Sequence, residues 1–252
     1  IIGALILLIF IAFSRGNLRI PLSTIPYVVL SSICACILIT LTYHAVDYLD
    51  VGLVMLILYC FPLGVALISY FRGKSKIVFV QWLSMVVLML GLYLMLSSGD
   101  QVLNLYGLFI SFLGLLFFIA FIVTASDLSE QIGATTFNLY VSLLGIIFLT
   151  VGFILPLGFE MDLPLTKTGI FAIFANGVFY ISSWVLFFKG ASIIGATRSS
   201  MLACIEPLFA ALLAIILLKQ ILSVTEWIGF FIVLTAIYTF EKNSAKAEAS
   251  ST

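Results

Sequence analysis

Glu206 holds the position in this 252-residue sequence that most strongly suggests chemistry, because no other charged side chain or histidine lies so deep inside an apolar run. That run, Ser199–Leu218, is long enough to cross a bilayer, and a charge at the bilayer centre costs at least about 2.5 kcal/mol. We therefore expect Glu206 to face a cavity or a polar partner. Pro207 lacks an N–H, so the Ala203 carbonyl loses its helical partner.

A carboxyl group beside an unbonded carbonyl would suit a cationic or amino group on a solute. The same carboxyl group could bind and release protons, so Glu206 is our candidate both for substrate binding and for proton coupling. The structural alternative is a protonated Glu206 that hydrogen-bonds between helices.

Two other apolar runs carry polar and aromatic side chains at helical spacing. Gly169–Phe188 contains Asn176, Tyr180 and Ser183 on one face with Trp184 beside them, and Ile25–Tyr43 contains Ser32, Cys36, Thr40 and Tyr43. Tyr140, in a third run, could line a cavity mouth. Polar side chains in lipid turn towards protein or water, so we predict that these residues bind the substrate. The alternative is hydrogen bonding between helices, worth about 0.6 to 2 kcal/mol.

Catalytic and metal-binding patterns are missing from the sequence. The single histidine, His44, falls in a predicted loop, and the four cysteines lie inside apolar runs without paired metal-ligand spacing. No phosphate-binding loop occurs. We therefore predict no catalytic residues, no metal, no cofactor and no enzymatic activity.

The composition identifies the elements that must position these residues. Hydrophobic residues make up 63% of the chain and charged residues 9%, against about 25% charged in a soluble domain. Charges and turn residues divide the chain into nine continuous apolar runs, and all but the first have the roughly 17 to 21 residues of a membrane-spanning helix. The runs are Ile1–Phe13, Ile25–Tyr43, Val51–Phe71, Ile77–Leu96, Leu105–Thr124, Thr135–Leu155, Gly169–Phe188, Ser199–Leu218 and Val224–Phe240. This pattern predicts an all-α polytopic membrane protein, with Ile1–Phe13 as the truncated end of a span.

The charged residues orient the predicted spans. Most basic residues fall on the side reached after the first run: Arg15, Arg19, Arg72, Lys74, Lys76, Lys189, Arg198, Lys242 and Lys246. Only Lys167 and Lys219 fall on the other side. The positive-inside rule makes the basic side cytoplasmic, with the C-terminus. One predicted cytoplasmic loop, Ser126–Gly133, carries acids instead, and the polar segment after Phe240 is expected to be disordered.

An internal repeat appears when the chain is shifted against itself by 145 residues. Pro62 then falls on Pro207, Trp82 on Trp227 and Tyr93 on Tyr238, although the chain has only 6 Pro and 3 Trp. Five spans separate the matched pairs, an odd number, so the second copy must be inverted in the membrane. Inverted repeats with a site between them characterise many secondary transporters.

These motifs resemble the EamA-type carriers of the drug/metabolite transporter superfamily. The resemblance rests on Lys189–Arg198 (KGASIIGATR), Ile205–Leu213 (IEPLFAALL) and Trp227–Gly229, and it extends to Phe61–Leu63 in the first half. It implies ten helices in two inverted repeats of five, about nine of them present here, around a central cavity. It also implies a first repeat over 1–98 without its first helix, a second repeat over 104–241 and a cytoplasmic tail over 242–252.

We therefore expect a secondary active transporter that moves a small organic metabolite (an amino acid, a nucleoside-like solute or a drug) by alternating access. The expected location is a bacterial inner membrane. Its partners would be the solute and membrane lipid, with a homodimer left open and no nucleic acid. The alternatives are a non-transporting scaffold or receptor subunit and, less favoured, a membrane-embedded enzyme.

Overall fold

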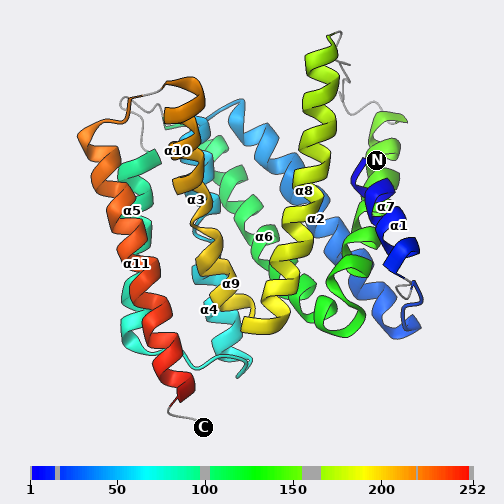
Figure 1. Ribbon diagram of the computed structural model, residues 1–252, viewed down its shortest axis with the longest axis horizontal. Helices are drawn as coiled ribbons and strands as arrows, with labels where there is room; N and C mark the ends of the chain where they lie inside the picture. The colour runs from blue at the N-terminus through cyan, green and yellow to red at the C-terminus, as the bar shows by residue number, and fades with distance from the viewer. Residues whose placement is uncertain (1, 15–17, 97–102, 155–165, 220, 250–252) are drawn as a thin grey trace. The chain divides into compact units, whose positions relative to one another are not determined.

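The computed structural model describes residues 2–14, 18–96, 103–154, 166–219 and 221–249. Every regular element in these ranges is a helix (Figure 1). The helices are α1 (Ile2–Ser14), η1 (Leu22–Thr24), α2 (Ile25–Val46), α3 (Val51–Leu58), α4 (Phe61–Phe71), α5 (Phe79–Leu96), α6 (Leu105–Ile132), α7 (Ala134–Ile154), α8 (Lys167–Ile194), α9 (Ala196–Ala203), α10 (Glu206–Leu218) and α11 (Val224–Ala249). Arg15, Asp100, Glu160 and Asp162 lie outside the described residues.

Eight helical segments among the described residues are long and apolar enough to cross a membrane, and α1 is a shorter apolar helix. Each of the eight overlaps one apolar run of the sequence. The predicted all-α polytopic membrane fold is therefore confirmed. Two of the eight, Val51–Phe71 and Ala196–Leu218, are each made of two α-helices, and a third, Leu22–Val46, consists of η1 and α2.

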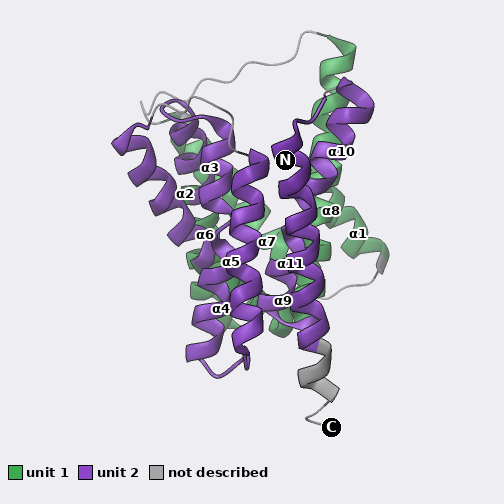
Figure 2. Cartoon of the chain, turned by 90° about the vertical axis from the view of Figure 1, so that its left-hand side faces the viewer, with its two compact units in different colours: residues 1–37, 120–193 green, residues 38–119, 194–252 purple. Residues whose placement is uncertain are grey.

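The chain forms two compact units, which Figure 2 shows in separate colours. Unit 1 comprises residues 1–37 and 120–193, and unit 2 comprises residues 38–119 and 194–252. Each unit therefore takes one segment from each half of the chain, so the units do not coincide with the sequence repeats.

The internal repeat is confirmed by the helix boundaries in unit 2. Shifting α3 by 145 residues reproduces both ends of α9, and the same shift carries the first residue of α4 onto that of α10 and the first residue of α5 onto that of α11. Equivalent residues therefore begin the same helices, although few of the side chains match.

Both last helices of the repeat begin with the same capping bond. The Val78 N–H donates to the side-chain oxygen of Gln81 at 2.9 Å, and the equivalent Ser223 N–H donates to Glu226 at 2.6 Å. Such a bond satisfies one of the backbone N–H groups that a helix start leaves unpaired. The Gln81 amide also donates to Ser244 at 2.8 Å, which fixes the start of α5 against the far end of α11.

The helices α5 and α11 form the most extensive helix pair of unit 2. They run antiparallel, since Gln81 contacts Ser244 near one end whereas Met95 lies beside Gly229 near the other. A Cβ atom on Gly229 would lie 2.6 Å from the Gly91 carbonyl oxygen and 2.8 Å from the Met95 nitrogen, so the two backbones are in direct contact. Small residues permit this close approach where lipid provides no hydrophobic drive.

Unit 1 is built on the packing of α1 against α7 and α8. Its core contains Leu7, Ile11, Leu139 and Ile181, all less than 10% exposed. A Cβ atom on Gly3 would lie 3.1 Å from the Ile181 side chain, so the glycine allows α1 to approach α8 closely. The short first apolar run is therefore a packed helix in this fold.

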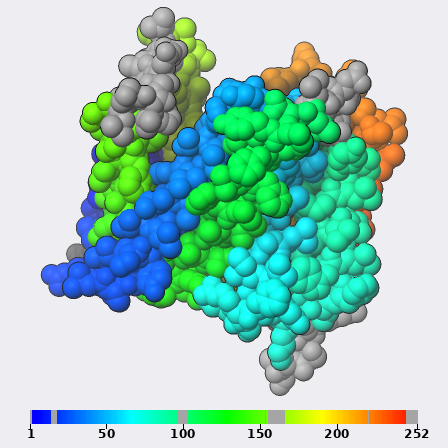
Figure 3. Space-filling view, turned by 180° about the vertical axis from the view of Figure 1, so that it is seen from behind, coloured from blue at the N-terminus to red at the C-terminus, as the bar shows by residue number. Residues whose placement is uncertain are grey.

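The helices α2 and α6 lie against each other along the face shown in Figure 3, where α2 is blue and α6 is green. Within unit 1 the Thr124 hydroxyl donates to Ser31 at 3.3 Å. Within unit 2 a Cβ atom on Gly114 would lie 3.7 Å from the Leu41 Cβ, at ordinary contact distance. Each unit thus contains part of the same pair of helices.

Three expectations about connecting segments are wrong. The predicted loop Ser126–Gly133 is helical, because α6 continues to Ile132 and only Gly133, at φ +83°, separates it from α7. Similarly, α8 passes through Lys189 and only Gly195, at φ +85°, separates it from α9. Both conformations favour glycine. The segment after Phe240 continues α11 to Ala249, since polar residues prolong a helix that is already nucleated.

Replacing Gly229 by alanine should lower the thermal unfolding midpoint of the purified protein in detergent. The added methyl group meets backbone atoms of α5 that cannot move independently, and overpacking of this kind costs about 1 to 3 kcal/mol. Gly145→Ala in α7 is the matched control, because a Cβ atom there meets nothing within 4 Å. Equal midpoints for the two variants would contradict the close packing of α5 and α11.

Candidate functional site

The candidate site is built on two helix interruptions at equivalent positions. Between α3 and α4 the Cys60 N–H donates to the Ile57 carbonyl at 3.1 Å, and between α9 and α10 the Ile205 N–H donates to the Leu202 carbonyl at 3.1 Å. Both are tighter i to i−3 bonds. Pro62 and Pro207 follow within the first turn of the next helix, where the missing N–H is tolerated.

These interruptions bring together four side chains of unit 2. The Tyr59 hydroxyl and the Glu206 carboxyl group lie within interaction range, and Cys204 lies near Tyr59, Glu206 and Cys60. Tyr59 and Cys204 are themselves equivalent under the 145-residue shift. The helix is interrupted beside Pro207, where the sequence predicted only an unbonded carbonyl at Ala203, and Tyr59 is a polar neighbour of Glu206.

Glu206 is the first residue of α10, and its side chain is exposed. At this position the N–H groups and the positive end of the helix dipole favour a negative charge. The equivalent residue at the start of α4 is Phe61, which is buried against Phe118 with ring centroids 4.5 Å apart. The same backbone position thus carries an acid in one repeat and an aromatic core residue in the other.

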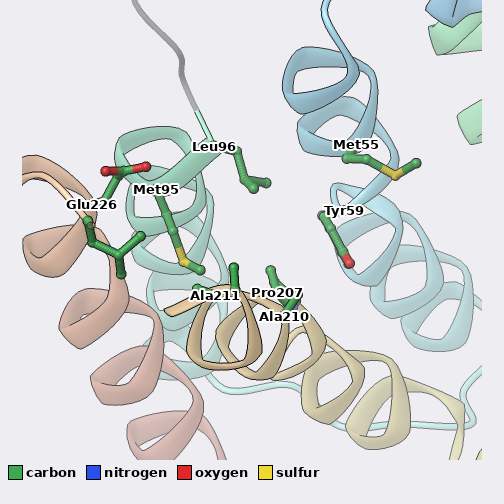
Figure 4. Close-up of a pocket in the computed structure, with 10 residues that line it drawn as sticks. Met55, Tyr59, Met95, Leu96, Pro207, Ala210, Ala211 and Glu226 are labelled. Atoms are coloured by element: carbon green, nitrogen blue, oxygen red, sulfur yellow. The ribbon is translucent and has the colours of Figure 1, made fainter. Parts of the chain in front are cut away.

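A cavity of about 330 Å³ lies beside this cluster, inside unit 2 (Figure 4). Figure 4 shows Met55 and Tyr59 on one side and Met95 and Leu96 on the other. Its remaining lining residues come from α10, α11 and the segment between them: Pro207, Ala210, Ala211, Ala214, Leu222 and Glu226. The described wall is apolar apart from Tyr59 and Glu226.

The predicted stripe in α8 lies in unit 1. Asn176, Tyr180 and Ser183 are all exposed, whereas Trp184 is half-buried. The Ser183 hydroxyl donates to the Tyr180 carbonyl at 2.8 Å. The three exposed side chains share one face of the helix, as predicted, and their binding role stays a prediction.

An aromatic cluster surrounds Trp184 in unit 1. Its ring stacks on Phe188 at 5.5 Å and meets Phe121 and Tyr180 edge-on at 5.4 and 6.2 Å. Edge-on and offset pairs add about 0.5 to 1.5 kcal/mol beyond their buried area. Trp184 is therefore held in place by neighbouring rings.

The predicted residues of α2 divide between the two units. Ser32, in unit 1, is fully buried, and its hydroxyl donates to the Val28 carbonyl at 2.8 Å, so it is engaged in helix packing. Thr40 and Tyr43, in unit 2, are exposed. In unit 1 the Tyr140 hydroxyl donates to the Leu18 carbonyl at 2.7 Å, which ties α7 to the segment after α1. Solute contact by these residues stays a prediction.

An ion pair within unit 2 was not predicted from the sequence. Arg198, in the first turn of α9, lies 2.7 Å from Glu241 of α11, and both side chains are less than 25% exposed. Sequence reasoning placed Arg198 in a loop and Glu241 at the start of the polar segment that follows the last apolar run. The hydrophilic stretch around Arg198 gave no indication that α9 begins there.

Comparisons with known proteins agree with this architecture. The sequence matches the EamA-like transporter family over residues 1–97 and 105–240. It is 34% identical over 61 residues to a protein of Salmonella typhimurium strain LT2 described as the uncharacterized inner membrane transporter YicL. That match covers 24% of this chain and 20% of the relative, so the chain spans about a fifth of the relative's length.

A solved structure described only as a crystal structure of a protein shares the fold. It superimposes with a TM-score of 0.74 at 15% sequence identity, covering 98% of this chain and 86% of that one.

Neutralising Glu241 by Glu241→Gln should destabilise the purified protein by about 1 to 2 kcal/mol. A charge-assisted hydrogen bond contributes roughly 1.5 to 3 kcal/mol, and partial exposure reduces this. The charge-reversed pair Arg198→Glu with Glu241→Arg should recover part of the loss. Asp47→Asn is the control, because Asp47 pairs with His44 at 3.4 Å on an exposed surface. Equal losses in thermal stability for Glu241→Gln and Asp47→Asn would contradict a structural role for the Arg198 ion pair.

Proposed function

Because the chain belongs to the EamA-like transporter family, we propose that it is a secondary active transporter that moves a small organic metabolite by alternating access. Membership of the family, with eight membrane-spanning helical segments in the described chain, makes it an integral membrane protein of transporter type. The solute class, the mechanism and proton coupling are the proposed part.

The observation that carries the proposal is the inverted pair of interrupted helices. Equivalent helices α5 and α11 run antiparallel, as inversion of the repeat requires, and each repeat has one interruption at the same register. Irregular backbone at membrane depth is tolerated where it is buried in protein or lines a water-filled cavity. Transporters place their binding sites at such interruptions.

Glu206 is the proposed coupling residue. It begins the half-helix α10 at the interruption, and its carboxyl group has the Tyr59 hydroxyl as a partner. A carboxylate at this position can exchange a proton for a solute cation. The exposed residues of the α8 stripe and the exposed residues of α2 are proposed to contact the solute in other parts of its path.

The proposed orientation places the C-terminus in the cytoplasm of a cell whose inner membrane holds the protein. The described basic residues support this, since Arg72, Lys74 and Lys76 follow α4 whereas Lys167 begins α8, at opposite ends of the predicted spans. A homodimer is compatible with this proposal and is not required by it.

Solute counterflow in proteoliposomes tests the transport function. Vesicles loaded in turn with each amino acid and each nucleoside should transiently accumulate the matching external tracer above empty vesicles for at least one solute. Absence of counterflow for the whole panel, together with no thermal stabilisation of the purified protein by any member, would contradict a metabolite carrier.

Glu206→Gln should reduce uptake driven by an imposed pH gradient by about tenfold while leaving counterflow of the same solute measurable. The amide cannot carry a proton, whereas exchange of loaded solute needs none. Glu130→Gln, which neutralises an exposed acid of α6, is the matched control. An unchanged response to the pH gradient in the Glu206 variant would remove proton coupling from the proposal.

Cysteine labelling tests the orientation in a background where the four native cysteines are replaced by alanine. A membrane-impermeant maleimide should label Lys74→Cys only after the inner membrane is opened, and should label Lys167→Cys in intact spheroplasts. The reverse pattern would place the C-terminus outside.

A further inference from the structure

The polarity of the cavity lining in unit 2 favours one class of ligand. Most of its wall consists of methyl, thioether and aliphatic groups, and Glu226 supplies the acidic group of the described lining. No Lys, Arg or His belongs to that lining. We propose that this cavity binds an organic monocation with an apolar body, typically an arylalkyl amine. It would be one binding site on the transport path of the carrier proposed above.

The charge on Glu226 is not needed for the fold. Its capping bond to the Ser223 N–H is reproduced in the first repeat by the neutral side chain of Gln81, which accepts from Val78 at a similar distance. Gln81 is also buried, whereas Glu226 is half-buried. The second repeat therefore carries an acid at a position where an amide suffices for helix initiation, and this acidic residue lines the cavity.

Glu206, beside Tyr59, is a second acid of the second repeat that replaces a non-acidic residue of the first repeat. Tyr59 lines the cavity, and its hydroxyl interacts with Glu206, which replaces the buried Phe61 of the first repeat. The cavity thus has one carboxylate in its wall and a second behind Tyr59. Both acids belong to the second repeat, so an ammonium group entering at Glu226 would find a second partner further along.

The wall is suited to an apolar body. Small side chains of α10, Ala210, Ala211 and Ala214, leave the open volume, and Met55 and Met95 belong to its lining (Figure 4). Methionine adapts to ligands of different shape. Tyr59 adds an aromatic ring to the lining, and aromatic rings attract cations. A volume of about 330 Å³ is at the lower end of the range for small-molecule sites, which suits a compact amine.

Equilibrium binding of 2-phenylethylamine to the full chain, purified in detergent, tests the proposal by isothermal titration calorimetry. 2-Phenylethanol is the neutral probe and 3-phenylpropionate the anionic probe. The amine should bind at least about tenfold more tightly than either. Equal affinity for the alcohol would show an apolar or lipid-tail site only and would overturn the proposal.

Two variants localise the binding. Glu226→Gln keeps the capping acceptor, so it should leave the thermal midpoint unchanged and weaken amine binding about tenfold. Ala211→Leu should fill the cavity and abolish binding of both the amine and the alcohol. Glu130→Gln is the charge-matched control and should change neither affinity. Unchanged amine affinity in Glu226→Gln or in Ala211→Leu would overturn the site.

The outcome separates this site from the transport function. Amine binding that depends on Glu226 without counterflow of any solute would support the site and contradict the carrier. Counterflow of a solute in a protein that does not bind the amine would support the carrier and overturn the site.

Discussion

The rest of unit 2 depends on the direct backbone contact between α5 and α11. Lipid provides little hydrophobic drive for helix association, so close packing and interhelical hydrogen bonds must hold the helices together. Gly91 and Gly229 remove the side chains that would separate the two backbones, and the bond from Gln81 to Ser244 fixes the register. Because α5 also contacts α3, and α11 contacts α9, this pair positions both half-helices that precede the interruptions. The candidate site is therefore positioned by the closely packed pair of helices α5 and α11.

The interruptions are acceptable only because the sequence compensates for them locally. The N–H groups of Cys60 and Ile205 are satisfied by tighter turns. Each proline lies in the first turn of a helix, where backbone N–H groups have no partner within the helix, so its missing N–H costs no hydrogen bond. At depth in a membrane an unpaired backbone group costs several kcal/mol, so such a backbone needs protein or water beside it. Packing of α4 against α9 supplies protein on one side, and the cavity lies on another.

The spans and the repeat could be predicted because both follow from hydrophobicity and from rare residues in register. The run Val51–Phe71, in contrast, reads as one continuous helix, since Tyr59 and Cys60 are not helix breakers. Its interruption follows from Pro62 together with the tertiary packing of α4. Asp127 and Glu130 suggested a loop by their charge, yet a helix of good local propensity continues through them to Ile132. The Tyr59–Glu206 pair joins residues far apart in the sequence, and no local pattern contains that information.

The two repeats share backbone geometry but differ in charge at equivalent positions. A symmetric pair of half-helices would offer equivalent surfaces to a solute from either side. Here Phe61 packs into the core while Glu206 stays exposed, and Gln81 is buried in a hydrogen bond while Glu226 lines a cavity. At each of these two pairs of equivalent positions, the residue of the first repeat is buried in packing and the residue of the second repeat is an accessible acid. The first repeat thus contributes packing at these positions, and the second contributes acidic side chains that the fold leaves at least partly exposed.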